Sequence, residues 1–193
     1  MSNRILLINS SQLENRAISS VITFYGNAVT TEKFDLKHGK QLMGSMKIDV
    51  LIIELNSREN LEFAKFARRT NRQLGIIFLS PIYDLRLFDI SKNELPERSQ
   101  LIYKPNVSNF ENILEAIVES KSLDSETRWI NSPEFEKTEK LTDLQVETLR
   151  MVVAGFTNKE IGKQSFVSEK AVEQRICRLA NVLGITFSSG QNL

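Results

Sequence analysis

The chain has 193 residues, of which 41% are hydrophobic and 25% are charged, and its formal net charge is +1. This is the composition of an ordinary globular protein, and the length allows one large or two small domains. No apolar run approaches the ~20 residues of a membrane span, and the N-terminus lacks a signal-peptide pattern, so we expect no membrane partner. The single cysteine, Cys177, excludes an internal disulfide framework and favours a cytoplasmic location.

The first two thirds of the chain alternate apolar strands with amphipathic helices. Strands are predicted over residues 4–9, 28–34, 49–55, 76–79 and 101–103. Helices are predicted over residues 10–25, 36–46, 61–72 and 107–119. One more helix is expected between residues 81 and 99, where the apolar run is short and the last part resembles a loop. This alternation predicts an α/β fold with a five-stranded, doubly wound parallel sheet.

The helical periodicity also predicts which side chains face this sheet. For the first helix they are Ala17, Ile18, Val21, Ile22 and Tyr25. For the last helix they are Phe110, Ile113, Leu114, Ile117 and Val118. The following segment is polar and contains Ser132-Pro133, which indicates an interdomain connection. We therefore expect an α/β domain over residues 1–121, a linker over 122–138 and an all-α domain over 139–193.

Three helix starts follow one another in this last domain. Thr142 and Thr157 are followed three residues later by Gln145 and Glu160, which is the pattern of a capping box. Ser168 is a third N-cap candidate. The middle helix is short and is tightly connected to the third. This is the pattern of a helix-turn-helix, whose second helix lies in the major groove of DNA.

The helix after Ser168 separates an apolar stripe from a polar face. The stripe consists of Val172, Ile176, Leu179 and Leu183. Lys170, Gln174 and Arg178 lie opposite at intervals of four residues, with Arg175 on the flank. Lysine and arginine can reach guanine edges or phosphates, and glutamine can read adenine. By pattern alone, an ordinary three-helix domain with a solvated charged face remains the alternative.

The residue order in this stretch resembles the LuxR/NarL (GerE-type) DNA-binding domain. The matching residues include Leu141-Thr142, Ala154-Gly155, Thr157–Ile161, Val167-Ser168, Val172 and Leu183–Ile185. The resemblance implies double-stranded DNA as partner. Its candidate contact residues are Thr157, Asn158, Lys159, Ser168, Lys170, Gln174, Arg175 and Arg178. Gln145, Glu173, Arg175 and Arg178 depart from the usual pattern, so the base preferences of the family do not carry over.

The charge of this domain predicts how it would bind. From Leu141 onward the chain carries six basic and five acidic residues, again a net charge of +1. Strong non-specific DNA binders are usually more basic, because neutralising phosphates supplies much of the affinity. We therefore expect a single copy to bind weakly and a homodimer to supply the rest.

The first domain resembles a response-regulator receiver, with flavodoxin-like topology. The acidic pair of that family falls on Asn9 and Ser10, and its phosphoacceptor aspartate falls on Glu54. Its hydroxyl falls on Ser80, and its Lys-Pro is present as Lys104-Pro105. The hydroxyl and the lysine are thus kept, whereas all three carboxylate positions are changed.

These changes predict a degenerate phosphorylation pocket. Mg²⁺ prefers oxygen ligands that include carboxylates, and Asn9 and Ser10 supply only neutral oxygens. The side chain of Glu54 is one methylene longer than that of an aspartate, so its oxygens would be displaced. We expect no phosphoacceptor cycle, no enzymatic activity, no cofactor and no metal site. Glu54 either forms a standing ion pair with Lys104, imitating the charge of a modified state, or has no signalling role.

The sequence therefore predicts a dimeric, phosphorylation-independent transcription regulator. A protein-interaction adaptor is the rival hypothesis. In that case the helix-turn-helix would contact RNA polymerase or another regulator, an idea motivated by Glu169, Glu173 and the low net charge.

Overall fold

The computed structural model describes residues 3–32, 36–106, 110–120, 127–130 and 141–185. The chain divides into two compact units. The first comprises residues 1–83 and 88–133, and the second comprises residues 134–193 together with 84–87. The predicted α/β fold and the predicted helix-turn-helix are both present.

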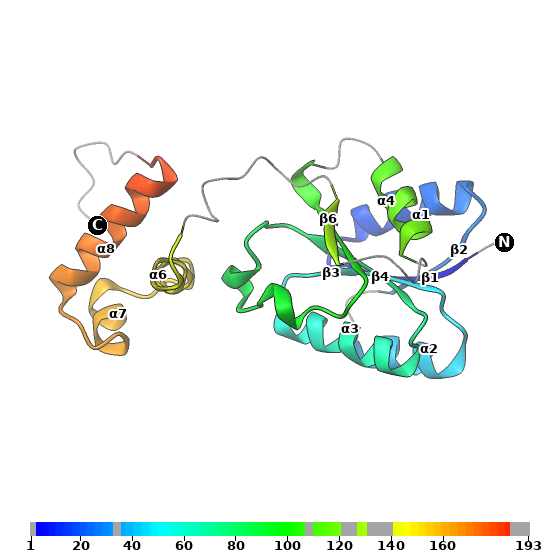
Figure 1. Cartoon of the computed structure of the whole chain (residues 1–193), viewed down its shortest axis with the longest axis horizontal. Helices are drawn as coiled ribbons and strands as arrows, with labels where there is room; N and C mark the ends of the chain where they lie inside the picture. The colour runs from blue at the N-terminus through cyan, green and yellow to red at the C-terminus, as the bar shows by residue number, and fades with distance from the viewer. Residues whose placement is uncertain (1–2, 33–35, 107–109, 121–126, 131–140, 186–193) are drawn as a thin grey trace. The chain divides into compact units, whose positions relative to one another are not determined.

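The first unit is built on a parallel sheet (Figure 1). In the described residues the sheet has six strands, in the order β2-β1-β3-β4-β5-β6. Their bounds are β1 Arg4–Ile8, β2 Ala28–Glu32, β3 Val50–Glu54, β4 Gly75–Ser80, β5 Ser99–Tyr103 and β6 Arg128–Ile130. The short β6 corrects the prediction of five strands, and it lies within the segment 122–138 that we predicted to be a linker.

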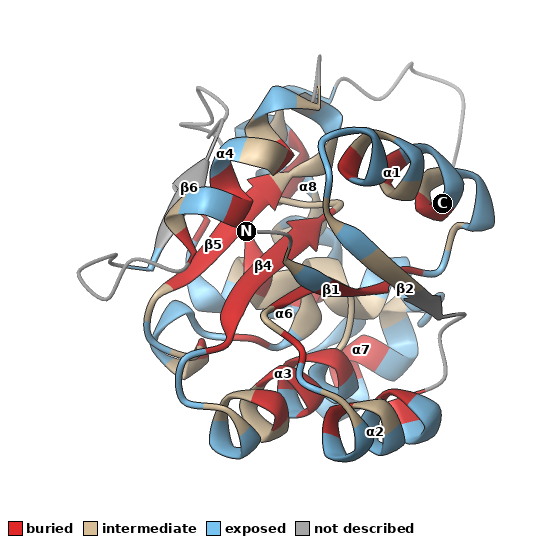
Figure 2. Cartoon of the chain, turned by 90° about the vertical axis from the view of Figure 1, so that its right-hand side faces the viewer, coloured by how far each residue is buried: buried red, intermediate tan, exposed pale blue. Residues whose placement is uncertain are grey.

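Helices cover both faces of the sheet (Figure 1). Helices α1 (Gln12–Phe24) and α4 (Glu111–Glu119) pack on one face, where Ile18, Ile22, Ile113 and Ile117 join the core. Helices α2 (Leu36–Ser45) and α3 (Arg58–Thr70) lie on the other face. Every residue of β3 and β4 is therefore buried, as Figure 2 shows for the red strands between the helices. This burial explains the continuous apolar runs in the sequence.

Two of these helices begin at serine caps that follow the ends of strands. The Ser11 hydroxyl accepts a hydrogen bond from the Glu14 N–H, and the Ser57 hydroxyl accepts one from the Asn60 N–H. Such caps satisfy backbone donors that the helix itself leaves open. They also fix the first turns of α1 and α3 near the carboxyl ends of β1 and β3.

The helix expected between residues 81 and 99 is not formed. Two short 3₁₀ helices replace it, η1 (Leu85–Phe88) and η2 (Lys92–Glu94). The positive φ of 60° at Asp89 ends helical geometry after η1. Ser91 and Glu94 form a local capping box, and Arg58 of α3 binds the Glu94 carboxylate at 2.6 Å. The apolar run is too short to sustain a helix, and polar contacts hold the segment instead.

The predicted inward faces of α1 and α4 are partly wrong. Tyr25 is 61% exposed and Val118 is 74% exposed, and Ala17 is also in the exposed class. The buried stripe of α1 runs through Asn15, Ile18 and Ile22. Asn15 is tolerated there because its side-chain amide donates to the Asn9 carbonyl at 3.1 Å. The apolar side chains displaced from the stripe form part of the surface of this layer.

The second unit contains α6 (Asp143–Val153), α7 (Asn158–Gln164) and α8 (Glu169–Leu183). Thr142, Thr157 and Ser168 are their N-caps, and both predicted capping boxes are present. Gly155 and Gly184 adopt positive φ at the ends of α6 and α8. The core residues include Leu141, Val146, Ile161, Val172 and Leu179. Val153, the last residue of α6, is 79% exposed.

Candidate functional site

The carboxyl ends of β1, β3 and β5 bring four of the predicted pocket residues together. Asn9 and Ser10 follow β1, Glu54 ends β3, and Lys104 follows β5. Ser80, at the end of β4, is fully buried, and its hydroxyl donates to the Ile82 carbonyl at 2.5 Å. The lysine, the two neutral residues and the glutamate are therefore joined, while the hydroxyl of Ser80 bonds to backbone.

Glu54 is the centre of this pocket and is only 4% exposed. Its Oε1 atom accepts from Lys104 Nζ at 2.8 Å, which is the ion pair of the first of the two alternatives for Glu54. Its Oε2 atom accepts from the Ser10 N–H at 3.1 Å, the Ser10 hydroxyl at 2.5 Å and the Asn56 amide at 3.1 Å. Both carboxylate oxygens are therefore engaged by donors of the chain itself.

Lys104 also binds a second carboxylate that sequence reasoning did not find. Glu14, in the first turn of α1, places Oε2 at 2.7 Å from Lys104 Nζ. The same oxygen accepts from the Asn9 side-chain amide at 2.7 Å. The only sequence signal for Glu14 is its place three residues after the Ser11 cap, where a helix N-terminus meets the edge of the sheet.

The contacts between Glu54 and Lys104 favour the charged form of both side chains. Burial alone would raise the pKa of Glu54, but hydrogen bonds from Lys104 and Ser10 outweigh it, so the pKa lies below the ordinary 4.5. Burial alone would lower the pKa of Lys104, but the hydrogen bonds to Glu14 and Glu54 raise it above the ordinary 10.5. Because the folded state lowers the pKa of Glu54, this carboxylate stabilises the fold above pH ~4.5, and the stabilisation is lost as the pH falls further.

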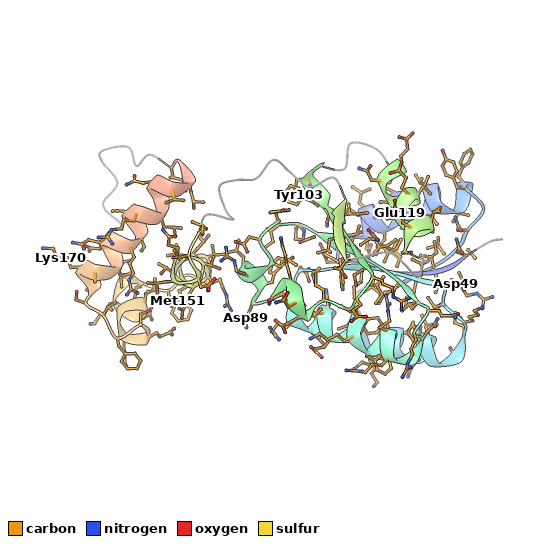
Figure 3. The ribbon with its side chains drawn as sticks, viewed as in Figure 1. Asp49, Asp89, Tyr103, Glu119, Met151 and Lys170 are labelled. Carbon is orange, nitrogen blue, oxygen red and sulfur yellow. The ribbon has the colours of Figure 1, made fainter. Side chains whose placement is uncertain are left out.

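The second candidate site is the polar face of α8. Lys170, Gln174 and Arg178 are all exposed, on the side of the helix opposite Val172 and Leu179. Figure 3 shows the Lys170 side chain extending from α8 into solvent. Arg175 is half-buried on the flank, and Cys177 is exposed beside Gln174. The face predicted to meet DNA is thus a solvent-facing row of polar side chains.

The remaining predicted contact residues surround the start of α7 and α8. Thr157 and Ser168 are exposed, but their hydroxyls accept the N–H groups of Glu160 and Ala171 at 3.3 Å. Lys159 is exposed, and Asn158 is half-buried. The two hydroxyl side chains therefore act as caps in this structure, and Lys159 is free to extend from the first turn of α7.

The two units define a class of protein, a receiver-like α/β domain followed in the chain by a helix-turn-helix. Residues 139–186 match the family of bacterial regulatory proteins called the luxR family, and they form a GerE-type helix-turn-helix domain of that family. None of the curated proteins compared with the chain matches it significantly.

Solved structures share this fold. A structure of two RcsB dimers bound to two parallel DNAs is 17% identical, covers 97% of this chain and 95% of its own, and has a TM-score of 0.61. RcsB from Salmonella enterica serovar Typhimurium bound to a promoter is 17% identical, with coverage of 97% and 95% and a TM-score of 0.54. The response regulator TrrA from Thermotoga maritima is 20% identical, covers 62% of this chain and 99% of its own, and has a TM-score of 0.50. At these identities the likeness establishes the fold alone.

No helix in the part of the chain that the structure describes is long and apolar enough to cross a membrane. The described residues also contain no group of three or more histidine, cysteine, aspartate or glutamate side chains that could hold a metal ion.

Proposed function

We propose that this chain is a cytoplasmic, DNA-binding transcription regulator of the response-regulator type, active without phosphorylation and as a homodimer. The observation that supports DNA binding best is the exposed row of Lys170, Gln174 and Arg178 on α8, the second helix of a GerE-type helix-turn-helix. In helix-turn-helix proteins this helix enters the major groove, where such side chains meet base edges and phosphates.

We expect Lys170→Ala, Gln174→Ala and Arg178→Ala each to weaken specific DNA binding by about 1–3 kcal/mol, because each removes a base or phosphate contact. All three residues are exposed, so their truncation leaves no cavity and the melting temperature should not change. The measurement is a titration of operator DNA. Lys47→Ala, on a lysine whose side chain is 81% exposed in the α/β domain, is the control for the loss of one positive charge. Wild-type affinity in all three variants would refute this orientation of α8.

The salt dependence of binding separates DNA recognition from the rival function. Gel shifts with genomic fragments across a salt series should show affinity falling steeply, because protein–phosphate contacts release counterions. The fragments that remain bound at higher salt then identify the operator. Binding that is weak and insensitive to sequence at every salt concentration would count against a regulator that reads DNA directly.

The rival is a protein-interaction adaptor whose helix-turn-helix contacts RNA polymerase or another regulator. Two observations favour it. Phe166, in the turn before α8, is 95% exposed, and Glu169 and Glu173 place acidic charge on α8. Large exposed aromatic side chains are typical anchors of protein interfaces. Phe166→Ala should weaken capture of polymerase if the adaptor function holds, and should leave DNA affinity nearly unchanged if it does not.

Phosphorylation independence rests on the contacts of Glu54. Both of its oxygens are occupied, and Lys104 is bound by two carboxylates at 2.7 and 2.8 Å. An incoming phosphoryl group would have to compete with these hydrogen-bond donors for the Glu54 carboxylate and with two carboxylates for the Lys104 ammonium. In the same pocket Asn9 and Ser10 supply only neutral oxygens for Mg²⁺.

Acetyl phosphate with Mg²⁺ is therefore expected not to label the protein. The assay is mass spectrometry of the intact chain, with a receiver that has the usual aspartate as positive control. Stoichiometric labelling that hydroxylamine removes, the behaviour of an acyl phosphate, would contradict the proposal.

The proposed homodimer uses the layer formed by α1 and α4. We place the candidate interface on the helix predicted over residues 107–119. Of it, α4 begins at Glu111, and residues 107–109 lie outside the described residues. Phe24 is 84% exposed, Tyr25 61% and Val118 74%, so this layer presents apolar area that a second copy could cover.

A further inference from the structure

A cavity of about 200 Å³ lies between α1 and α4 at the edge of the Glu54–Lys104 pocket. Its walls are apolar, and they are formed by Ala17, Ile18, Leu79, Phe110 and Ile113. Among the described residues that line the cavity, Glu14 and Lys104 carry charge. An enclosed apolar cavity of about 150 Å³ takes up benzene, so this one has room for a single ring or a short alkyl chain.

The charges at the edge of the cavity define which ligand fits. Lys104 Nζ is bound by two carboxylates, Glu14 at 2.7 Å and Glu54 at 2.8 Å. Two negative groups and one positive group leave one unit of negative charge. Glu54 is almost fully buried, whereas the Glu14 side chain is 40% exposed, so the excess negative charge is accessible at Glu14.

The Glu14 carboxylate still has an accepting side. Its Oε2 atom receives the Lys104 ammonium and the Asn9 amide, each at 2.7 Å. A cationic group can therefore bind Glu14 without displacing Lys104. A carboxylate ligand, in contrast, would meet two carboxylates and a lysine that they already neutralise. The ring of Phe110 also lines the cavity, and an aromatic ring attracts a nearby cation.

We infer that this cavity binds a small primary amine with an apolar body of one ring or a short alkyl chain. The ammonium binds Glu14, and the body fills the space between Ala17, Phe110 and Ile113. A charged hydrogen bond of this kind is worth more than a neutral one, so the amine should bind about tenfold more tightly than an alcohol of the same shape. This site is distinct from the polar face of α8, and its walls come mainly from α1 and α4, the two helices that the proposed homodimer uses.

The test is a titration of the full-length protein in which heteronuclear NMR and calorimetry measure binding. Phenethylamine and hexylamine are the probes, with phenethyl alcohol as the neutral analogue and hydrocinnamate as the acidic analogue. The expected result is saturable amine binding that shifts the amide signals of Ala17, Phe110 and Ile113. No saturable binding by either amine, equal binding of the alcohol, or tighter binding of the acid would each overturn the inference.

Two variants make the result specific to the cavity. Glu14→Gln keeps the shape but removes the charge, and it should reduce amine binding to that of the alcohol. Ala17→Leu, at an exposed helical position, should fill the cavity and abolish binding without lowering the melting temperature. Glu115→Gln, on an exposed carboxylate of α4 that does not line the cavity, is the matched control and should bind like wild type. Loss of binding in this control would also overturn the inference.

Discussion

Lys104→Met is expected to lower the free energy of unfolding by about 2–4 kcal/mol at neutral pH, because it leaves the Glu54 carboxylate buried without its counter-ion. Glu54 is 4% exposed, and Lys104 supplies the only ammonium among the hydrogen bonds that the structure describes for it. Ser10 and Asn56 still donate hydrogen bonds to the Glu54 carboxylate in this variant, so the loss should stay below that of a wholly unpaired buried charge. Urea unfolding at constant pH measures it.

The pH dependence of this loss identifies its cause. In the wild type the pKa of Glu54 is lowered, so its contribution disappears as the pH falls below ~4.5. Without Lys104, burial should raise the pKa of Glu54, and the variant should protonate at a higher pH than the wild type. The deficit of Lys104→Met should therefore shrink towards acidic pH. A deficit that is independent of pH would indicate lost packing of the lysine stem instead.

The matched partner of this variant is Glu54→Gln combined with Lys104→Met. Removing both charges should recover most of the stability, because no buried ion is then left unpaired and Glu14, which also loses Lys104, is 40% exposed to solvent. The exposed Lys47→Met is the control, and it should cost less than about 0.5 kcal/mol. The DNA affinity of the folded double variant also decides whether the Glu54–Lys104 ion pair has a regulatory role. Unchanged DNA affinity would mean that Glu54 is structural, and reduced affinity would mean that the pair imitates a modified state.

Local patterns in the sequence predicted most of the fold. Thr142, Thr157 and Ser168 cap their helices as expected, because a cap depends only on residues within one turn. The apolar run ending at Glu54 predicted β3 because both faces of the sheet are covered. Helix phase was harder to predict, since Val118 directly follows the buried Ile117 in an apolar run but lies on the exposed side of α4.

The candidate pocket was only partly predictable, because some of its contacts join residues that lie far apart in the sequence. Resemblance placed Asn9, Ser10, Glu54 and Lys104 at one edge of the sheet, and the structure brings them together. Glu14 was missed because its contact with Lys104 joins residues ninety positions apart on α1 and after β5. No periodicity encodes such a contact. Strand β6 was missed because three residues are too few for a strand pattern.

The fragment of residues 141–193 is expected to bind operator DNA about a hundredfold or more weakly than the full-length protein. Its formal charge is only +1, so phosphate contacts from one copy give little affinity. A dimer places two recognition helices on successive half-sites, and the second helix then binds as an intramolecular event. Parallel DNA titrations and sedimentation of both proteins measure the affinity and the oligomeric state. The unphosphorylated full-length protein should sediment as a dimer.

Variants of the α1–α4 layer test whether that layer holds the dimer. Phe24→Asp combined with Val118→Asp places two charges on side chains that are 84% and 74% exposed, so the fold should be kept while the apolar contact is lost. This protein should sediment as a monomer and bind DNA like the fragment. Gln41→Asp, at an exposed position of α2 on the other layer, should remain dimeric. A full-length protein that is monomeric and binds no more tightly than its fragment would show that the receiver-like domain does not act by pairing helix-turn-helix domains. A double variant that stays dimeric would instead place the interface outside α1 and α4.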